Sequence, residues 1–394
     1  MSKPAFRPAD AVGVLILATA SIIGINQYAY GIYNHCITIP FIKSLVNPAL
    51  YGNDYLIAEI KYFYSLFLPG CSALIVLLKS SLPVTFFILY SISLYSTLVA
   101  FFLIALKLFE KKEVAYFSTM LLIFSLTTLG QEKTVENILM ERTFALPFLL
   151  FSFYAFFTRH FNTAALLAGI AFLFHPLSAS YVMAMLLACM LYRVVKEKSS
   201  RNFLIGIGIV ALVASPLIIM KIKNPVPGFS LIHANKDWIE LLRIRSSHHV
   251  FPTAWSIAEI LKSVALITGF IAAWKYKPQP DYHRIVKISF FTMLLLFCIG
   301  TVFTELIPVS IVIQFQLFRS FKFLVYFAII YYANFIFTEP NTLPGSVSKL
   351  LLTALIAAPY WHEGSAVFAG LLLLMLSTAF GLWMVEKSES RKYL

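Results

Sequence analysis

Long apolar segments separated by short polar ones dominate this chain. A helix needs roughly 20 consecutive apolar residues to cross the hydrocarbon core of a membrane, and segments near that length recur throughout the 394 residues. Hydrophobic residues make up 60% of the chain and charged residues 12%, whereas a soluble domain carries roughly a quarter charged residues. A soluble core has no room for so much apolar surface. The sequence therefore predicts an all-α, polytopic membrane protein.

The apolar segments predict about 12 membrane-embedded helices in one transmembrane domain that covers residues 1–394. The stretch 162–192 is too long for one span, and His175-Pro176 interrupts it. Because proline breaks the hydrogen-bond ladder of a helix, we expect two short helices there, joined as a hairpin with this pair at its tip. The other predicted spans are 10–29, 84–106, 114–130, 143–158, 202–220, 257–274, 286–304, 311–337, 347–360 and 364–385.

Lysine and arginine near the helix ends set the predicted orientation, since cytoplasmic loops carry an excess of these residues. Their distribution favours a multi-pass protein of the cell (inner) membrane with both termini in the cytoplasm. Lys3 and Arg7 precede the first apolar run as in a signal peptide, but no small-residue cleavage site follows, so we expect a retained first helix. In such a chain the net charge of +13 indicates contact with anionic lipid rather than nucleic acid.

Two outer loops are long in this topology, 30–83 and 221–256. The apolar piece 62–78 of the first loop fits either an interfacial helix or a re-entrant segment. The second loop is basic, although cations are disfavoured on that side of a membrane. Binding of an anion is the simplest explanation for these cations, which are Lys221, Lys223, Lys236, Arg243 and Arg245.

Polar and ionisable residues gather at the predicted outer face, and few interrupt the cytoplasmic halves of the spans. Ionisable residues at membrane depth are costly, so they point to function by default. We therefore predict one outer-facing site, in which Asp54, Arg142, His175 and His248 or His249 line a single cavity. The candidate site residues are Asn34, His35, Asp54, Glu59, Glu141, Arg142, His175, Arg243, His248, His249, Glu305, Gln316 and Arg319.

Asp54 lies between Pro48 and an apolar run that begins at Tyr55. A carboxylate in this turn can act as a general base on a hydroxyl group, or it can hold a divalent cation. It can equally cap the helix that Tyr55 would begin, because aspartate is a preferred N-cap residue. These interpretations stay open at the level of the sequence.

Glu141 and Arg142 open one predicted span, and His175 lies at the tip of the hairpin. Glutamate suits a helix N-terminus, whereas a cation there is unfavourable. Arg142 is therefore expected to be paired with a carboxylate or bound to an anion. His175 fits either a water-facing helix break or a site residue.

His248 and His249 follow the arginines of the second outer loop. The sequence holds no HExxH zinc motif and no CxxC pair among its four cysteines, so we predict phosphate contacts rather than a metal site. Arg319 and Lys322 are three residues apart and share a helix face. They either snorkel to the outer interface or clamp a phosphate. No P-loop, GxSxG or GxGxxG motif is present.

With these motifs the chain resembles the glycosyltransferase C superfamily, and especially a branch of bacterial membrane proteins within it. The resemblance runs from residue 24 to about residue 325 and rests on short motifs. These are Tyr30-Gly31 to Asn34-His35, Pro48 to Asp54, Arg142 to Pro147, His175-Pro176, His248-His249 to Pro252, and Glu305 to Arg319. It implies a GT-C-like fold and an acidic catalytic residue in the first outer loop, at Asp54. The usual acidic pair is not adjacent here, because Glu59 is the next carboxylate.

The resemblance implies inverting transfer of a sugar from a polyprenyl-phosphate lipid to a glycan, lipid or protein acceptor at the outer face. Asp54 would deprotonate the acceptor, and Arg142, Arg243, His248, His249 and Arg319 would bind the phosphate. Two alternatives stay open, a carrier of a lipid-linked or anionic substrate and a non-catalytic subunit of a polysaccharide-assembly complex. A divalent cation is the one candidate cofactor, and the expected partners are the lipid donor, membrane lipids and the acceptor.

Overall fold

The computed structural model describes residues 4–226, 230–342, 345–350 and 353. These residues form helices and loops, with two isolated β-bridges, Thr127 to Lys133 and His233 to Val309. The expected all-α class is therefore confirmed for the part of the chain described. The span predicted at 364–385 lies outside that part, as does most of the span predicted at 347–360.

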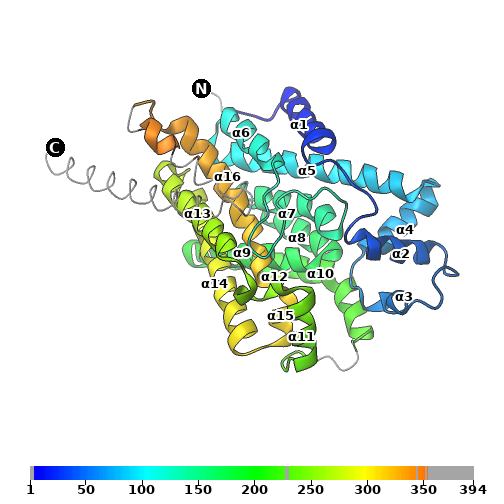
Figure 1. Cartoon of the computed structure of the whole chain (residues 1–394). Helices are drawn as coiled ribbons and strands as arrows, with labels where there is room; N and C mark the ends of the chain where they lie inside the picture. The colour runs from blue at the N-terminus through cyan, green and yellow to red at the C-terminus, as the bar shows by residue number, and fades with distance from the viewer. Residues whose placement is uncertain (1–3, 227–229, 343–344, 351–352, 354–394) are drawn as a thin grey trace.

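The helices follow one another closely along the chain, with short 3-10 or π-helical turns at several of their ends (Figure 1). In the first half they are α1 (Pro8–Ala20), α2 (His35–Val46), α3 (Tyr55–Ala58), α4 (Phe67–Leu78), α5 (Leu82–Phe109), α6 (Lys112–Ile123), α7 (Glu141–Phe157) and α8 (Phe161–Phe174). In the second half they are α9 (Pro176–Glu197), α10 (Arg201–Lys223), α11 (Lys236–Arg245), α12 (Ser247–Val250), α13 (Ile257–Ala273), α14 (Pro280–Thr301), α15 (Ser310–Phe315) and α16 (Phe321–Thr338).

Seven helical segments of the described chain are long and apolar enough to cross a membrane, judged by length and composition. Three further helices, α6, α7 and α8, are shorter, with 12, 17 and 14 residues. The described residues thus support a polytopic membrane protein, but they do not confirm the expected total of about 12 membrane-embedded helices. The seven segments are Pro8–Ile25, Leu82–Phe109, Pro176–Glu197, Arg201–Lys223, Ile257–Tyr276, Pro280–Leu306 and Ser310–Thr338.

Ion pairs connect several helix ends on one side of the molecule, and we call this side the first end. Lys112 Nζ lies 2.6 Å from Asp10, which joins the starts of α6 and α1. Lys196, near the end of α9, pairs with Asp281 at the start of α14 at 2.7 Å. These two ion pairs thus join the ends of four helices that were predicted to face the cytoplasm. The central loop (124–140) lies at the other, second end, where α6 and α8 end and α7, α9 and α16 begin.

The segment 162–192 contains two helices that pack against each other, with His175 between α8 and α9. Pro176 occupies the first position of α9, where its missing N–H leaves no hydrogen bond unmade. The predicted break is therefore where the sequence indicated. With 22 residues, α9 is longer than the short helix that we expected.

The central loop is irregular in backbone yet largely buried. The side chains of distant helices hydrogen-bond to its carbonyl groups: Tyr326 to Thr134 at 2.7 Å and Tyr90 to Glu136 at 2.9 Å. The predicted span 114–130 was too long, because α6 ends at Ile123. A tight turn between Thr128 and Glu132, closed by hydrogen bonds of 2.8 and 2.7 Å, replaces the helical ladder there.

The first outer loop forms α2, α3 and α4, which lie together on the right of the view in Figure 1. The chain just before α4 is held to the end of α8, because Leu66 N–H donates to Leu173 O at 2.8 Å and Ser65 Oγ donates to Phe174 O at 2.6 Å. The ambiguous piece 62–78 thus contains a 12-residue apolar helix, α4. This docking brings the loop to the second end of the helices.

Candidate functional site

Five ionisable side chains form a buried network at the second end, which we call the charge cluster: Glu132, Glu136, Arg142, Arg319 and Lys322. Glu132 lies at its centre and is 3% exposed. It pairs with Arg319 through one carboxylate oxygen, and the other oxygen lies 3.3 Å from Arg142 and 3.7 Å from Lys322. Arg142 also contacts Glu136 at 3.0 Å. Three cations therefore share two carboxylates.

The local backbone brings Arg319 to Glu132. Gly130 adopts a left-handed conformation (φ 76°), and a Cβ atom there would lie 3.3 Å from the backbone nitrogen of Arg319. Glycine thus permits the close approach of the two segments. Gln316 accepts a second hydrogen bond from the Arg319 guanidinium at 2.7 Å, which fixes its orientation.

Electrostatics keep Glu132 ionised despite its burial. Burial favours the protonated form of a carboxyl group, but the positive charges of Arg319, Arg142 and Lys322 outweigh it and hold the pKa of Glu132 well below its usual range. The N-termini of α7, α9 and α16 also lie at this end. Since each helix N-terminus carries a partial positive charge, the surroundings favour additional negative charge.

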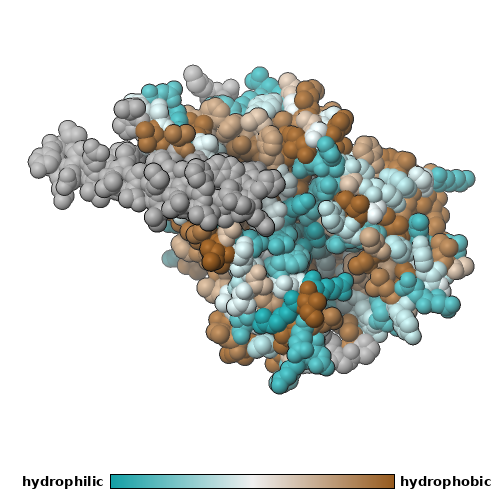
Figure 2. Space-filling view, in the orientation of Figure 1, coloured by the Kyte–Doolittle hydropathy of each residue, from teal (hydrophilic) through white to brown (hydrophobic). Residues whose placement is uncertain are grey.

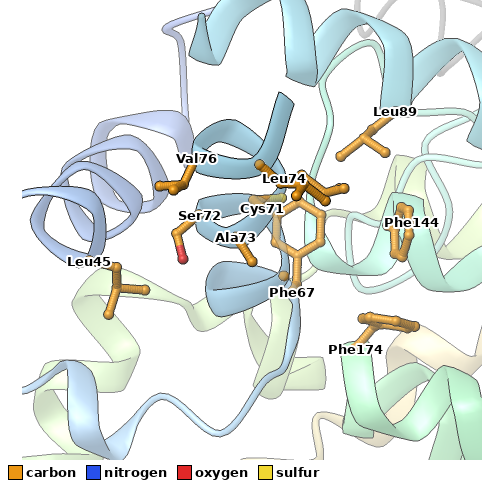
Figure 3. A pocket seen from close by; sticks show the side chains of 12 residues that line it. Leu45, Phe67, Cys71, Ser72, Ala73, Leu74, Val76, Leu89, Phe144 and Phe174 are labelled. Carbon is orange, nitrogen blue, oxygen red and sulfur yellow. The ribbon is translucent and has the colours of Figure 1, made fainter. Parts of the chain in front are cut away.

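An apolar cavity of about 750 Å³ adjoins the start of α7. Figure 3 shows Phe144 of α7 and Phe174 of α8 on one side of it, across from the Phe67 and Cys71 side chains of α4. Phe144 contacts both Phe67 and Phe174, with ring centroids 5.7 and 4.8 Å apart. The remaining lining residues are Leu45, Gly70, Ser72, Ala73, Leu74, Val76, Leu77 and Leu89.

The cavity and the charge cluster are neighbours through two helix ends. Phe144 lies two positions after Arg142 in the first turn of α7, and Phe174 directly precedes His175. His175 interacts electrostatically with Glu132 and Arg319, and its Nδ1 contacts Ser178 Oγ at 2.9 Å. A polar, cationic region and an apolar cavity thus share a border at the hairpin tip.

The structure brings several of the predicted site residues together. Arg142 is paired with carboxylates, as its place at a helix N-terminus indicated. His249 joins the cluster through Gly130, whose carbonyl lies 2.6 Å from its Nδ1, and the His248 ring lies against the His249 ring. The members now placed at or beside the cluster are Glu141, Arg142, His175, His248, His249, Gln316 and Arg319.

Other predicted residues have local roles. Asp54 is exposed and caps α3, with its carboxylate accepting from Leu56 N at 2.8 Å and from Ile57 N at 3.3 Å. We predicted that Asp54, Arg142 and the histidines line a single cavity. The contacts instead place Asp54 at the exposed start of α3. Glu59 and Asn34 are also exposed.

His35 and Glu305 are engaged with backbone or neighbouring side chains away from the cluster. His35 is buried, with Nε2 2.7 Å from Leu139 O. Glu305 accepts from the Thr253 hydroxyl at 2.6 Å and pairs with Arg243 at 3.3 Å. The Arg243 guanidinium lies over the Phe251 ring, 4.1 Å from its centroid. These contacts hold the second outer loop onto the end of α14.

The centre of the site was not predicted from the sequence. Glu132 and Glu136 belong to the run Gln131-Glu132-Lys133-Thr134-Val135-Glu136, and neither was among the candidate site residues. Within the described ranges no group of three or more His, Cys, Asp or Glu side chains is arranged to hold a metal ion. Comparison with known proteins adds no assignment: no protein-family model, no curated protein and no solved structure matches this chain.

Protonation of His249 is expected to destabilise the protein in acid. Burial, followed by the positive charge of Arg319, lowers the pKa of His249 to about 4, whereas an unfolded histidine has a pKa near ~6.5. Between these values the unfolded chain binds more protons, so stability falls as the pH drops from about 6.5 toward 4. Thermal unfolding of wild-type protein and His249→Gln at about pH 7.5 and pH 5 measures this. The variant should lose less stability in acid, and an equal loss in both proteins contradicts the prediction.

Proposed function

We propose that this chain is a membrane glycosyltransferase that uses a polyprenyl-phosphate-linked sugar at the second end of its helices. The observation that carries the proposal is the shared border between the cationic charge cluster and the apolar cavity. A polyprenyl-phosphate sugar has the matching chemistry, since a long hydrocarbon tail adjoins a charged phosphate. The proposal also agrees with the sequence motifs that resemble the glycosyltransferase C superfamily.

The charge cluster supplies the features expected of a phosphate site. Arginine and lysine are the charged side chains that typically hydrogen-bond phosphate oxygens. Arg142, Arg319 and Lys322 all lie within 4 Å of the Glu132 carboxylate. In glycosyl transfer the phosphate gains negative charge as it leaves the sugar. Cations and helix N-termini that are already in place stabilise that charge without reorganisation.

The cavity supplies the features expected of a tail site. Its lining is almost wholly hydrophobic, and apolar surface is buried there at roughly 25 cal/mol per Å². Val76 and Leu77 of α4 are 61% and 76% exposed, so one wall of the cavity reaches the molecular surface. An isoprenoid chain can therefore enter from the membrane while its phosphate reaches the hairpin tip.

In this proposal the second end of the helices lies at the outer face of the cell (inner) membrane. The first end gathers basic residues such as Lys111, Lys112, Lys196 and Lys275, as the positive-inside rule expects of a cytoplasmic face. In Figure 2, hydrophilic side chains extend from the centre of the view down over α11, and brown apolar areas lie above and beside them. Apolar surface next to a polar region fits a belt of lipid beside an aqueous face.

Purified protein in lipid nanodiscs provides the test. Undecaprenyl phosphate should bind, whereas undecaprenol, which has the same tail without the phosphate, should bind at least about 10-fold more weakly. Radiolabelled undecaprenyl-phosphate mannose, glucose, galactose and arabinose then serve as donors with a membrane extract as acceptor. Accumulation of the intact lipid sugar inside vesicles without transfer would favour a carrier. Equal binding of phosphate and alcohol overturns the proposal.

Filling the cavity is expected to weaken binding of the lipid. Ala73→Phe adds a ring to the cavity wall on α4, so the affinity for undecaprenyl phosphate should fall roughly 10-fold or more, because apolar contacts of the tail are lost. The matched control is Ala211→Phe on α10, an exposed position away from the cavity. Affinity unchanged by Ala73→Phe, with the control also unchanged, would remove the cavity from the binding site.

A further inference from the structure

Glu141 is a buried carboxylate that no cation neutralises directly. It is 9% exposed, and its Oε1 atom has no hydrogen-bond partner. Within the residues described, no salt bridge includes Glu141. A buried carboxylate without a partner is costly, which points to a role that needs a free carboxylate oxygen.

The other carboxylates of the second end are occupied or exposed. Glu132 and Glu136 are held by the cations of the charge cluster. Glu305 accepts two hydrogen bonds from Thr253. Glu259 accepts hydrogen bonds from Ser256, the N-cap residue of α13, and Asp54 caps α3 in contact with solvent. A carboxylate bound by cations or N–H donors is a weak proton acceptor. Glu141 keeps one carboxylate oxygen, Oε1, that accepts no hydrogen bond.

Glu141 also lies where the two halves of the proposed site meet. It is the first residue of α7 and shares a helix face with Phe144 three positions later, which lines the cavity. Cys71, another lining residue, interacts electrostatically with Glu141. Arg142, the next residue in the chain, belongs to the charge cluster. A donor with its tail in the cavity and its phosphate at the cluster would therefore place its sugar beside Glu141.

We propose that Glu141 is the catalytic base, which takes the proton of the acceptor hydroxyl during glycosyl transfer. This inference deepens the proposed function and rests on it. The acceptor oxygen forms a bond to the anomeric carbon while the bond from that carbon to the phosphate oxygen breaks. The phosphate leaves with the bonding electron pair, next to Arg142, Arg319 and Lys322, and the hydroxyl proton passes to Glu141. The negative charge of the bound donor makes a neighbouring carboxylate a stronger base.

Transfer from the undecaprenyl-phosphate sugar that wild-type protein uses tests the assignment. Glu141→Gln should lower the transfer rate at least about 100-fold, as removal of a general base does, while the affinity for undecaprenyl phosphate stays within about 3-fold of the wild type. Glu240→Gln, the same change at an exposed position of α11, is the matched control. Transfer by Glu141→Gln near the wild-type rate overturns the inference but leaves the function intact. A comparable loss in Asp54→Asn alone assigns the base to the first outer loop instead.

A chemical label keeps the inference testable if Glu141→Gln does not fold, or if the lipid binds and none of the four sugars is transferred. Dicyclohexylcarbodiimide is apolar and reacts with carboxyl groups in apolar surroundings. In the wild-type protein it should modify Glu141 in preference to Glu132, and undecaprenyl phosphate should reduce the modification at least about 10-fold. Peptide mass spectrometry measures this. Absence of labelling at Glu141, or labelling that the lipid does not reduce, contradicts the inference. If neither binding nor transfer occurs, the proposed function itself fails.

Discussion

Replacing Glu132 with glutamine is expected to lower the free energy of unfolding by about 3–5 kcal/mol, because the substitution removes one partner of a buried ion network. Arg319 would lose its carboxylate, and Arg142 and Lys322 would lose a shared anion within 4 Å. The surrounding helices leave little room for water to replace it, since Glu132 is 3% exposed. Equilibrium unfolding in mixed micelles, followed by tryptophan fluorescence, gives the free energy directly.

Two further variants make this measurement specific. Glu113→Gln on α6 is the same chemical change at an exposed position, where a shift within about 0.5 kcal/mol is expected. Adding Lys322→Met to Glu132→Gln removes one of the three cations and should restore part of the lost stability, because the net charge of the cluster returns to its original value. Stability of Glu132→Gln within about 0.5 kcal/mol of the wild type contradicts the central position of Glu132.

Lys322→Met alone is expected to separate ligand binding from stability. The 3.7 Å distance between Lys322 Nζ and Glu132 is the longest ion contact of the charge cluster, so this ammonium group is the cation most available to a ligand phosphate. Its loss should lower the affinity for undecaprenyl phosphate roughly 10–100-fold, the contribution of a hydrogen bond to a charged group. Binding titrations in nanodiscs measure the affinity.

Stability should respond in the opposite direction to affinity. Without Lys322 the remaining two cations and two carboxylates balance, and the buried methionine side chain has no charge to desolvate. Unfolding of Lys322→Met should therefore require at least as much free energy as unfolding of the wild type. Lys262→Met on α13, a lysine outside the charge cluster, controls for the loss of one positive charge. A destabilised Lys322→Met protein with normal affinity would make Lys322 a purely structural residue.

The contrast between Arg142 and Asp54 shows how far a single residue can be interpreted from its neighbours in the chain. A cation at a helix N-terminus is unfavourable wherever the helix lies, so the sequence alone indicated that Arg142 needs a counter-charge. The structure supplies Glu132 and Glu136. An aspartate before an apolar run is compatible with a cap, a base or a metal ligand. The hydrogen bonds to Leu56 and Ile57 describe the cap.

The sequence by itself determined the polytopic membrane character, the all-helical fold of the described residues and the helix break at His175-Pro176. These properties depend on composition, on apolar segment length and on the local geometry of proline, all of which are readable within a window of the chain. The number of helices long enough to span a membrane could not be predicted as well from the sequence. α6 ends at Ile123, well before the turn at Gly130, and the apolar residues that continue beyond Ile123 do not reveal where the helix stops.

Only the tertiary structure decided that Glu132 is the centre of the site and that the Oε1 atom of Glu141 has no hydrogen-bond partner. Glu132 lies 187 positions from Arg319, and its run of charged neighbours is typical of a solvated turn. A charged residue is buried when folding brings cations to it, and those cations come from the starts of α7 and α16. Whether a carboxylate is paired or free depends on such long-range contacts, which no local pattern encodes.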